Sequence, residues 1–360
     1  MYYILAIMGN EPYKLLLNQL CEKTEEIEIT DTDKLVIFSD LHMGNRRSGD
    51  DFFNNSALFK KALQDYYLKK EYTLILNGDI EELHQYPLHL IRKRWDDVYK
   101  IFDSFYETGR LYKIFGNHDS KLFSFPDIPL RYPLHEALRL RYKNEAVFLF
   151  HGHQLSFFYQ KFNDLMGLIL RYFARPLRIK SYSVAHDKLK KYKIEKRLYE
   201  FSKEKQIVSI IGHTHRPLFE SMSKIDTLNY QIETLLRKFQ KTKIQDREEI
   251  EIEIRELKAE IDRQEEEKGQ ELSLSHVYSA STIVPCVFNS GCVIGKRGIT
   301  AIEILKGKIM LVHWVNKNVD KRYIRDDAKN TIRLDGTDYY RTVLKKDDLD
   351  YIFSRIRLLS

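Results

Sequence analysis

Five short groups of histidine, aspartate and asparagine residues recur along the chain, and each follows an apolar run. They are Asp40-Leu-His42, Asn77-Gly-Asp79, Asn117-His118-Asp119, His151-Gly-His153 and His213-Thr-His215. Imidazole nitrogens with carboxylate or amide oxygens suit Mn, Fe, Zn or Ni, and none of the five groups offers a cysteine. A lone buried His or Asp is more often a core or turn residue, but coincidence does not explain five repeats at equivalent places. The residues therefore predict a metal site.

The apolar runs that precede these groups have the length and composition of buried β-strands. They cover residues 35–38, 73–76, 111–115, 146–150 and 207–211. Helical patterns at 52–69 and 95–108 alternate with them, which is typical of an α/β sheet covered by helices. Ligands collect at the carboxyl ends of strands in such sheets, so the five groups should meet there. Strand-like pieces at 299–305 and 309–314, joined by a Lys306-Gly-Lys308 turn, indicate a second, partly antiparallel sheet.

The order of these motifs resembles the signature of the calcineurin-like metallophosphoesterases, which reads D-x-H, G-D, G-N-H-D, H and G-H-x-H. The corresponding segments here are Asp40-Leu-His42, Gly78-Asp79, Gly116-Asn-His-Asp119, His151 and Gly212-His-Thr-His215. The resemblance runs from about residue 34 to residue 314. Each element is weak alone, but the combination is specific. Glycine precedes Asp79, Asn117 and His213, where it would let the backbone approach an ion or a phosphate group.

The resemblance implies a four-layer α/β/β/α sandwich and an enzyme that hydrolyses a phosphate ester or pyrophosphate with two divalent metal ions, Mn above all. It assigns two sets of metal ligands that share Asp79 as a bridge: Asp40, His42 and His215 in one, and Asn117, His151 and His213 in the other. The two oxygens of a carboxylate can reach two cations about 3.5–4 Å apart, which acidify a shared water into the attacking hydroxide. His118 would protonate the leaving oxygen, and Asp119 could orient its ring.

Two positions near these ligands stay open. His151 and His153 compete for one ligand place, and His151 is favoured because it follows the strand directly. His153 then contacts substrate, supports the ligands or fills space. Glu82 stands where the family is often acidic, but a carboxylate that caps a helix explains it equally well.

Within the family, the chain is most similar to the UDP-2,3-diacylglucosamine hydrolases, through segments 39–44, 78–82 and 212–217. Those enzymes typically carry Arg in place of His118 and Asp in place of His153, which leaves the substrate open. A nucleotide-linked lipid or sugar is one expectation. A metal-dependent nuclease or nucleotide phosphodiesterase is an alternative, and a non-catalytic scaffold on the same fold is another.

Residues 226–267 interrupt the domain with apolar residues at spacings of four, three and four, the spacing of a coiled coil. We expect an antiparallel helical hairpin that turns near residues 242–246, although two surface helices on the main domain would show the same pattern. The hairpin divides the phosphoesterase domain into 34–225 and 268–316. Residues 1–33 form an N-terminal extension in this division, and residues 317–360 form a C-terminal tail with a terminal helix at 347–359.

Residues 155–180 are unusually apolar and lead into several arginines, including Arg171 and Arg175. They predict a helical lid, about 155–205, whose apolar side chains meet acyl chains of a substrate or a membrane surface while the arginines meet phosphates. A helix in the core or in a dimer interface is the plainer alternative.

Net charge and cysteine content indicate which partners and which cellular compartment suit the protein. The 360 residues carry a net charge of +7. Because segment 226–267 holds thirteen acidic against eight basic residues, the remainder is five units more positive, which suits a phosphorylated small molecule, a nucleic acid or an anionic membrane. Cys21, Cys286 and Cys292 show no disulfide or metal-ligand spacing. No apolar stretch is long enough to span a membrane, so we expect a cytoplasmic protein, peripheral at most, that could dimerise through the hairpin.

Overall fold

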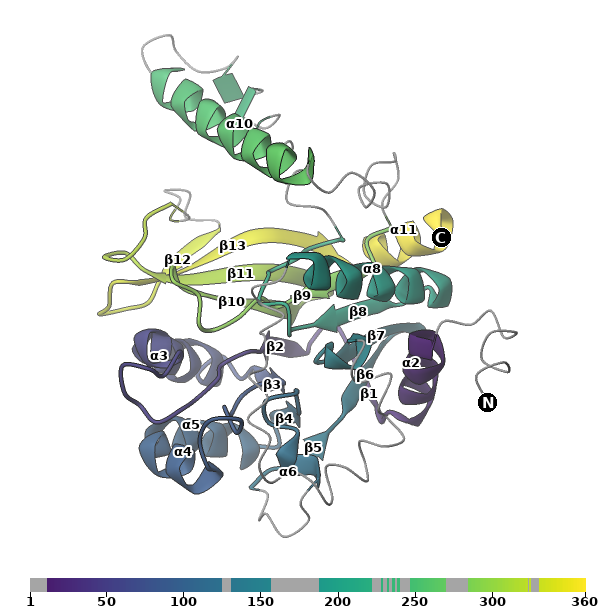
Figure 1. Ribbon diagram of the computed structural model, residues 1–360, viewed down its shortest axis with the longest axis vertical. Coiled ribbons are helices and arrows are strands. Elements are labelled where there is room, and N and C mark those ends of the chain that lie inside the picture. Colours follow the sequence, from purple (N-terminus) through teal and green to yellow (C-terminus); the bar gives the residue numbers. More distant parts are fainter. Residues whose placement is uncertain are drawn as a thin grey trace.

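The computed structural model describes residues 12–124, 131–156, 188–221, 247–269, 284–322 and 330–360, with residue 324 and a few helical positions from 228 to 239. Two β-sheets pack face to face, and helices cover the outer face of each (Figure 1). This is the four-layer α/β/β/α sandwich that the sequence predicts.

The larger sheet has eight strands in the order β12-β13-β11-β10-β2-β3-β4-β5. Six of its strands are β2 (Lys34–Phe38), β3 (Thr73–Asn77), β4 (Leu111–Ile114), β5 (Leu134–His135), β10 (Ile299–Leu305) and β11 (Lys308–Asn316), of which β5 lies at the edge of the sheet. Strands β2 to β5 are parallel, whereas β10 runs antiparallel to both β2 and β11. Alternate residues of β2 serve the two faces: Val36 and Phe38 join the outer core, and Leu35 and Ile37 join the core between the sheets.

Most helices on the outer face of the larger sheet come from the segments predicted to be helical, whereas the helix at residues 88–94 lies outside them. The helices are η1 (Phe53–Asn55), α3 (Ser56–Lys61), η2 (Ala62–Leu68), α4 (Leu88–Arg94) and α5 (Asp96–Tyr106). Their apolar residues, with Trp95 and Trp314, form one buried cluster against the sheet. The β2–β4 half of the sheet is therefore covered on both faces, as its continuous apolar strands require.

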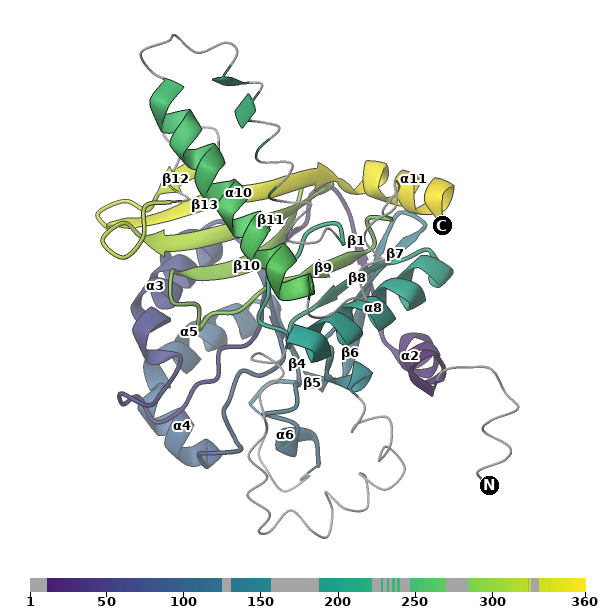
Figure 2. The same ribbon diagram turned by 45° about the horizontal axis from the view of Figure 1, so that its top comes forward.

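The smaller sheet has five strands in the order β1-β6-β7-β8-β9. The strands are β1 (Glu26–Ile29), β6 (Ala137–Tyr142), β7 (Glu145–Phe150), β8 (Val208–Ile211) and β9 (Val287–Asn289). Helices α2 (Pro12–Lys23), α8 (Lys188–Lys205) and α11 (Leu349–Leu359) contribute to the same buried cluster as this sheet and the inner face of the larger one. Figure 2 shows α2, α8 and α11 on the same side of the molecule as this sheet.

The two ends of the domain differ from the sequence-based division. Helix α2 and β1 belong to the core, because Tyr13 and Leu17 are buried and β1 pairs in parallel with β6. Residues after 316 form no separate tail: β13 (Tyr339–Asp348) pairs with β11, and β12 (Thr331–Arg333) pairs with β13. Strand β13 was not predicted because its charged residues suggest an exposed segment. Arg341 is instead buried, with its Nε 2.8 Å from Glu303 Oε1.

The interrupting segment is helical where it is described, and helix α10 (Arg247–Gly269) extends away from the two sheets (Figures 1 and 2). Leu228 and Ile250 are buried, and the Arg247 guanidinium lies 4.8 Å from the centre of the Phe239 ring. The turn at 242–246 lies outside the described residues, so the antiparallel hairpin stays a prediction.

Most of the expected lid also lies outside the described residues, including Arg171 and Arg175. Its final part is helix α8, which packs on the smaller sheet through Leu198 and Phe201. Among the described helices, none combines the length and the apolar character needed to cross a bilayer.

Candidate metal centre

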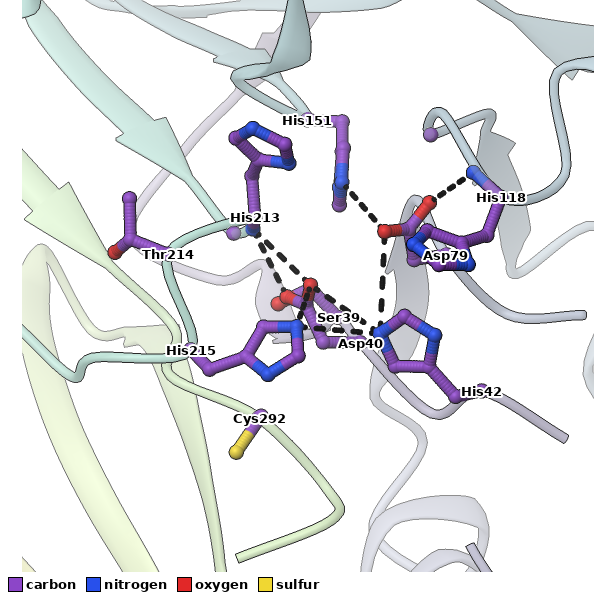
Figure 3. Close-up of polar contacts among 12 residues, drawn as sticks. Ser39, Asp40, His42, Asp79, His118, His151, His213, Thr214, His215 and Cys292 are labelled. Carbon is purple, nitrogen blue, oxygen red and sulfur yellow. Dashed lines mark hydrogen bonds and ion pairs between the residues drawn. The ribbon is translucent and has the colours of Figure 1, made fainter. Parts of the chain in front are cut away.

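The five groups of polar residues meet at the carboxyl ends of strands from both sheets. Strands β2, β3 and β4 of the larger sheet lead into Asp40, Asp79 and Asn117, and β7 and β8 of the smaller sheet lead into His151 and His213. Figure 3 shows the side chains of Asp40, Asp79 and five histidines gathered around a common space. The convergence follows from the topology, because these parallel strands end at the same edge.

The first cluster consists of Asp40, His42 and His215, whose ligand atoms lie within 4.8 Å of one another. His215 Nε2 is 3.0 Å from Asp40 Oδ1 and 3.2 Å from His42 Nε2. Ligand atoms bound to one ion at about 2.0–2.2 Å come this close to each other. The Nδ1 of His42 lies 3.1 Å from Glu82 Oε2, which leaves Nε2 to face the cluster.

The second cluster consists of Asp79, His151 and His213. His151 Nε2 lies 3.1 Å from Asp79 Oδ2, while its Nδ1 lies 2.9 Å from the backbone carbonyl oxygen of Asn77. The carbonyl oxygen can only accept a hydrogen bond, so Nδ1 carries a proton. This leaves Nε2 as the nitrogen that can bind a cation. His213 Nε2 and Asn117 Oδ1 are buried and have no hydrogen-bond partner within the protein. A bound cation would supply the missing partner of these two buried ligand atoms.

Asp79 lies between the clusters, and the two oxygens of its carboxylate have different contacts. Oδ2 is 3.1 Å from His151 Nε2 and 3.9 Å from His42 Nε2. Oδ1 instead accepts a hydrogen bond of 2.8 Å from the backbone N–H of His118. We expected one oxygen for each ion, whereas the geometry turns a single oxygen toward both clusters, because the other is held by the backbone.

Three glycines make room for the ligands. A Cβ atom at Gly78 would collide with the His151 ring, and one at Gly116 would collide with the Asp79 carboxylate. A Cβ at Gly212 would lie 2.6 Å from Asp40 Oδ2. The glycines predicted to allow a close approach therefore accommodate other ligands of the site, and any larger residue there would displace them.

Ligand-bearing residues also have an unusual backbone conformation. Positive φ angles occur at Asp40 (55°), His42 (49°), Asp79 (54°), His213 (63°) and His215 (55°). A left-handed conformation at a non-glycine residue costs on the order of 1–3 kcal/mol and is typical of functional sites. Packing and hydrogen bonding in the surrounding sheets must offset this conformational cost at the five residues.

Glu82 connects the first cluster to the expected general acid. Its Oε2 lies 3.1 Å from His42 Nδ1 and 2.7 Å from His118 Nδ1. Asp119, which we expected to orient His118, accepts hydrogen bonds from the backbone N–H groups of Gly116 and Ile80 instead. That expectation was wrong, because the chain turns the Asp119 side chain inward, where backbone N–H groups take both of its oxygens.

The charges of the site favour metal binding. Burial alone would raise the pKa of Asp79, but His151, His118 and His42 hold it well below its usual value, so the carboxylate is ionised. Burial and, after it, the neighbouring His151 together lower the pKa of His213 to about 3, so this ring is neutral. Burial opposes protonation of His118, yet Asp79 and Glu82 raise its pKa to about 9. Burial opposes protonation of His151 too, yet Asp79 raises its pKa to about 10, so the site without a metal combines anionic carboxylates, the neutral His213 ring and two protonated histidines.

His153 sits behind the ligands. It begins the short helix η3 (His153–Leu155), is 4% exposed, and has its ring 5.8 Å from that of Phe115 and 5.6 Å from that of His151. Burial, His151 and His213 hold its pKa well below the usual value. The geometry therefore favours His151 as the ligand and gives His153 a packing position.

Asn289 is a structural residue of the site that the sequence did not single out. Its side-chain NH₂ donates to the Gly212 carbonyl at 2.8 Å and to Thr214 Oγ1 at 2.9 Å. It thereby fixes the loop that carries His213 and His215. The signal was its position directly after an apolar run, the same signal that marked the ligands.

A second group of charges borders the first cluster on the side of α8. Glu195, which is 2% exposed, lies 3.4 Å from Arg216 Nη1 and also accepts from Thr214 Oγ1. Arg216 follows His215 directly, and Lys191 precedes Glu195 by one helical turn. Burial lowers the pKa of Lys191. One buried carboxylate thus holds Arg216 next to the ligand cluster, and Lys191 lies close enough to interact electrostatically with Glu195, Arg216 and Asp40.

Comparison with known proteins identifies one family whose model matches the chain. The model of the calcineurin-like phosphoesterase family matches residues 34–240, more than half of the chain. No curated protein sequence matches the chain significantly. Among solved structures, the chain is similar to a conserved uncharacterized protein from Streptococcus pneumoniae TIGR4, described as a predicted phosphoesterase. That pair is 11% identical, the alignment covers 79% of this chain and 89% of the other, and the TM-score is 0.29.

Proposed function

The chain belongs to the calcineurin-like phosphoesterase family, and we propose that it hydrolyses a phosphoanhydride or phosphodiester bond at a centre of two divalent cations that share Asp79. As a member of that family, the protein is a metal-dependent hydrolase of phosphate esters. The proposal adds the number of ions, the ligand assignment and the class of substrate.

The observation that carries the proposal is the pair of ligand clusters on either side of Asp79 Oδ2. Asp40, His42 and His215 would hold one ion, and Asn117, His151 and His213 the other. Nitrogen and oxygen donors without thiolates suit Mn, Fe, Zn or Ni. Two cations in these places would lower the pKa of a water molecule and offset the negative charge of the phosphoryl group.

The residues around the clusters would divide the remaining tasks. His118, protonated and held by Glu82, stands beside Asp79 and can donate its proton to the leaving oxygen. Glu82 also orients His42, so one carboxylate positions both a ligand and the acid. Asp119 keeps the Gly116–Asn117 turn in shape through the backbone, which makes it a positioning residue.

We infer a substrate with a second anionic group from Arg216 and Lys191. The Arg216 side chain is 35% exposed and is bound on one side by Glu195, so its position is fixed while part of it stays accessible. A guanidinium held in this way can pair with a phosphate group. A pyrophosphate bond of a nucleotide-linked sugar or lipid offers one phosphoryl group to the cations and a second to these side chains.

A Mn-supplemented substrate screen tests the proposal. The purified protein is given p-nitrophenyl esters, nucleotide sugars, a nucleotide-linked acyl sugar, and single- and double-stranded DNA. We expect two metal ions per chain and the highest kcat/KM on a nucleotide-linked pyrophosphate. Arg216→Ala should raise KM for that substrate but not for a p-nitrophenyl ester, and Lys203→Ala on helix α8 serves as control. Preferred cleavage of DNA would make the protein a nuclease, and no hydrolysis by the two-metal form would contradict the proposal.

A further inference from the structure

A third group of potential ligands stands next to the two clusters. Ligand atoms of Glu82, His84 and His118 lie within 4.8 Å of one another. The rings of His84 and His118 are in contact, with centroids 4.5 Å apart and planes tilted by 36°. Glu82 is buried at 5% exposure, whereas His84 is exposed. The group is thus anchored in the protein at one end and open to solvent at the other.

An unused atom in this group points to a ligand. Glu82 Oε2 is engaged by His42 and His118, but Glu82 Oε1 is buried without a hydrogen-bond partner. A buried carboxylate oxygen without a partner costs free energy that a bound cation would recover.

We propose that Glu82, His84 and His118 form a third metal site, an exchangeable Zn²⁺ site separate from the dinuclear centre. Two imidazoles, one carboxylate and an open fourth position make a ligand set that Zn²⁺ binds in tetrahedral geometry. A site with two nitrogen ligands also binds Zn²⁺ more tightly than Mn²⁺, following the general order of divalent metal affinities. Mn therefore leaves the site free at concentrations at which Zn fills it.

Occupation of this site has a consequence for catalysis. A Zn²⁺ ion bound to one ring nitrogen of His118 replaces the proton on that nitrogen and so excludes the doubly protonated, cationic ring that would act as the acid. Zn²⁺ would then inhibit the Mn-loaded enzyme, most strongly on substrates whose leaving group requires protonation. This consequence rests on the proposed function, whereas binding of the third ion does not.

Metal counting on the Mn-loaded protein tests the site. Protein saturated with Mn²⁺ is dialysed against fixed Mn²⁺ and increasing Zn²⁺, and both metals are counted by mass spectrometry. We expect the total metal content of the wild type to rise by one ion per chain as Zn²⁺ is added, whichever metal fills the dinuclear centre, whose histidines also favour Zn²⁺. His84→Ala should bind this extra Zn at least about 10-fold more weakly, since a ligand is lost. His89→Ala, which removes another exposed histidine a few residues away, should bind it as the wild type does.

The possible outcomes separate the two proposals. Replacement of Mn by Zn without a net gain, or an extra Zn that His84→Ala retains unchanged, would overturn the third site. Fewer than two Mn in the starting protein, combined with a Zn gain that depends on His84, would instead overturn the dinuclear centre and leave the third site standing. Zn inhibition that disappears in His84→Ala, measured on an ester with an aliphatic leaving group, would link the site to His118.

Discussion

Replacement of Glu82 by Gln isolates the contact that keeps His118 protonated. Glu82 Oε2 lies 2.7 Å from His118 Nδ1, and the two side chains are 7% and 13% exposed, so solvent screens this pair little. A hydrogen bond to a charged group contributes about 1.5–3 kcal/mol. At about 1.4 kcal/mol per pKa unit, loss of that charge should lower the pKa of His118 by about 1–2 units. Bound cations lower this pKa in both proteins, so the difference between them persists.

The alkaline limb of the pH–rate profile measures this shift. A general acid must be protonated, so activity falls as pH rises through its pKa, and the limb in Glu82→Gln should lie about 1–2 pH units lower. kcat/KM is measured at saturating Mn, because Glu82 also supports His42 and its loss weakens metal binding. An unchanged alkaline limb, or an equal shift with a p-nitrophenyl ester, which needs little protonation, would refute the assigned role of His118. Asp119→Asn should destabilise the fold without moving the limb, because Asp119 contacts only backbone N–H groups here.

Further substitutions probe the rest of the molecule. Asp79→Asn should abolish hydrolysis and reduce bound metal, and retention of both would contradict the two-cation centre. His118→Ala should keep its metal but slow turnover by roughly 10²–10⁴ for poor leaving groups, with p-nitrophenyl esters affected least. Arg341→Ala leaves the charge of Glu303 buried and should cost about 3–5 kcal/mol in unfolding free energy, seen as a lower Tm. Burial lowers the pKa of His313 to about 4, so the unfolded chain takes up a proton before the folded chain does as pH falls below about 6.5. Roughly 3 kcal/mol of unfolding free energy should therefore be lost between pH 6.5 and pH 4. His313→Gln should not show this loss.

The parts of the site that the sequence predicted are those set by chain direction. A polar group directly after a buried strand must lie at the carboxyl end of that strand, and parallel strands bring such ends together. For this reason the positions of Asp40, Asp79, His151 and His213 followed from the apolar runs before them. The alternation of strands and helices predicted only an α/β sheet covered by helices, and the four layers were implied by the resemblance to the calcineurin-like family.

The parts that it missed depend on which way a side chain turns within a loop. Asp119 and Glu82 both lie close to ligands in sequence. Asp119 was expected to orient His118 and the role of Glu82 was left open, because only the folded backbone decides which carboxylate meets His118. Strand β13 was missed for a related reason. Its charged residues looked solvent-exposed, whereas Arg341 turns inward to a carboxylate on β10 that lies 38 residues away.

The place of β2 in the larger sheet bears on how the protein is made. Strand β2 is paired with β3 on one side and with β10 on the other, and β10 is followed by β11 and β13. A nascent chain that has emerged as far as His215 already carries every proposed ligand of the dinuclear centre. One edge of β2 is still unpaired at that stage, because its partner β10, residues 299–305, has not yet been synthesised. That open edge can pair with other chains, and its closure requires contacts between distant parts of the sequence. We therefore expect folding to finish late in synthesis, with the ligands assembled only after β10 has docked.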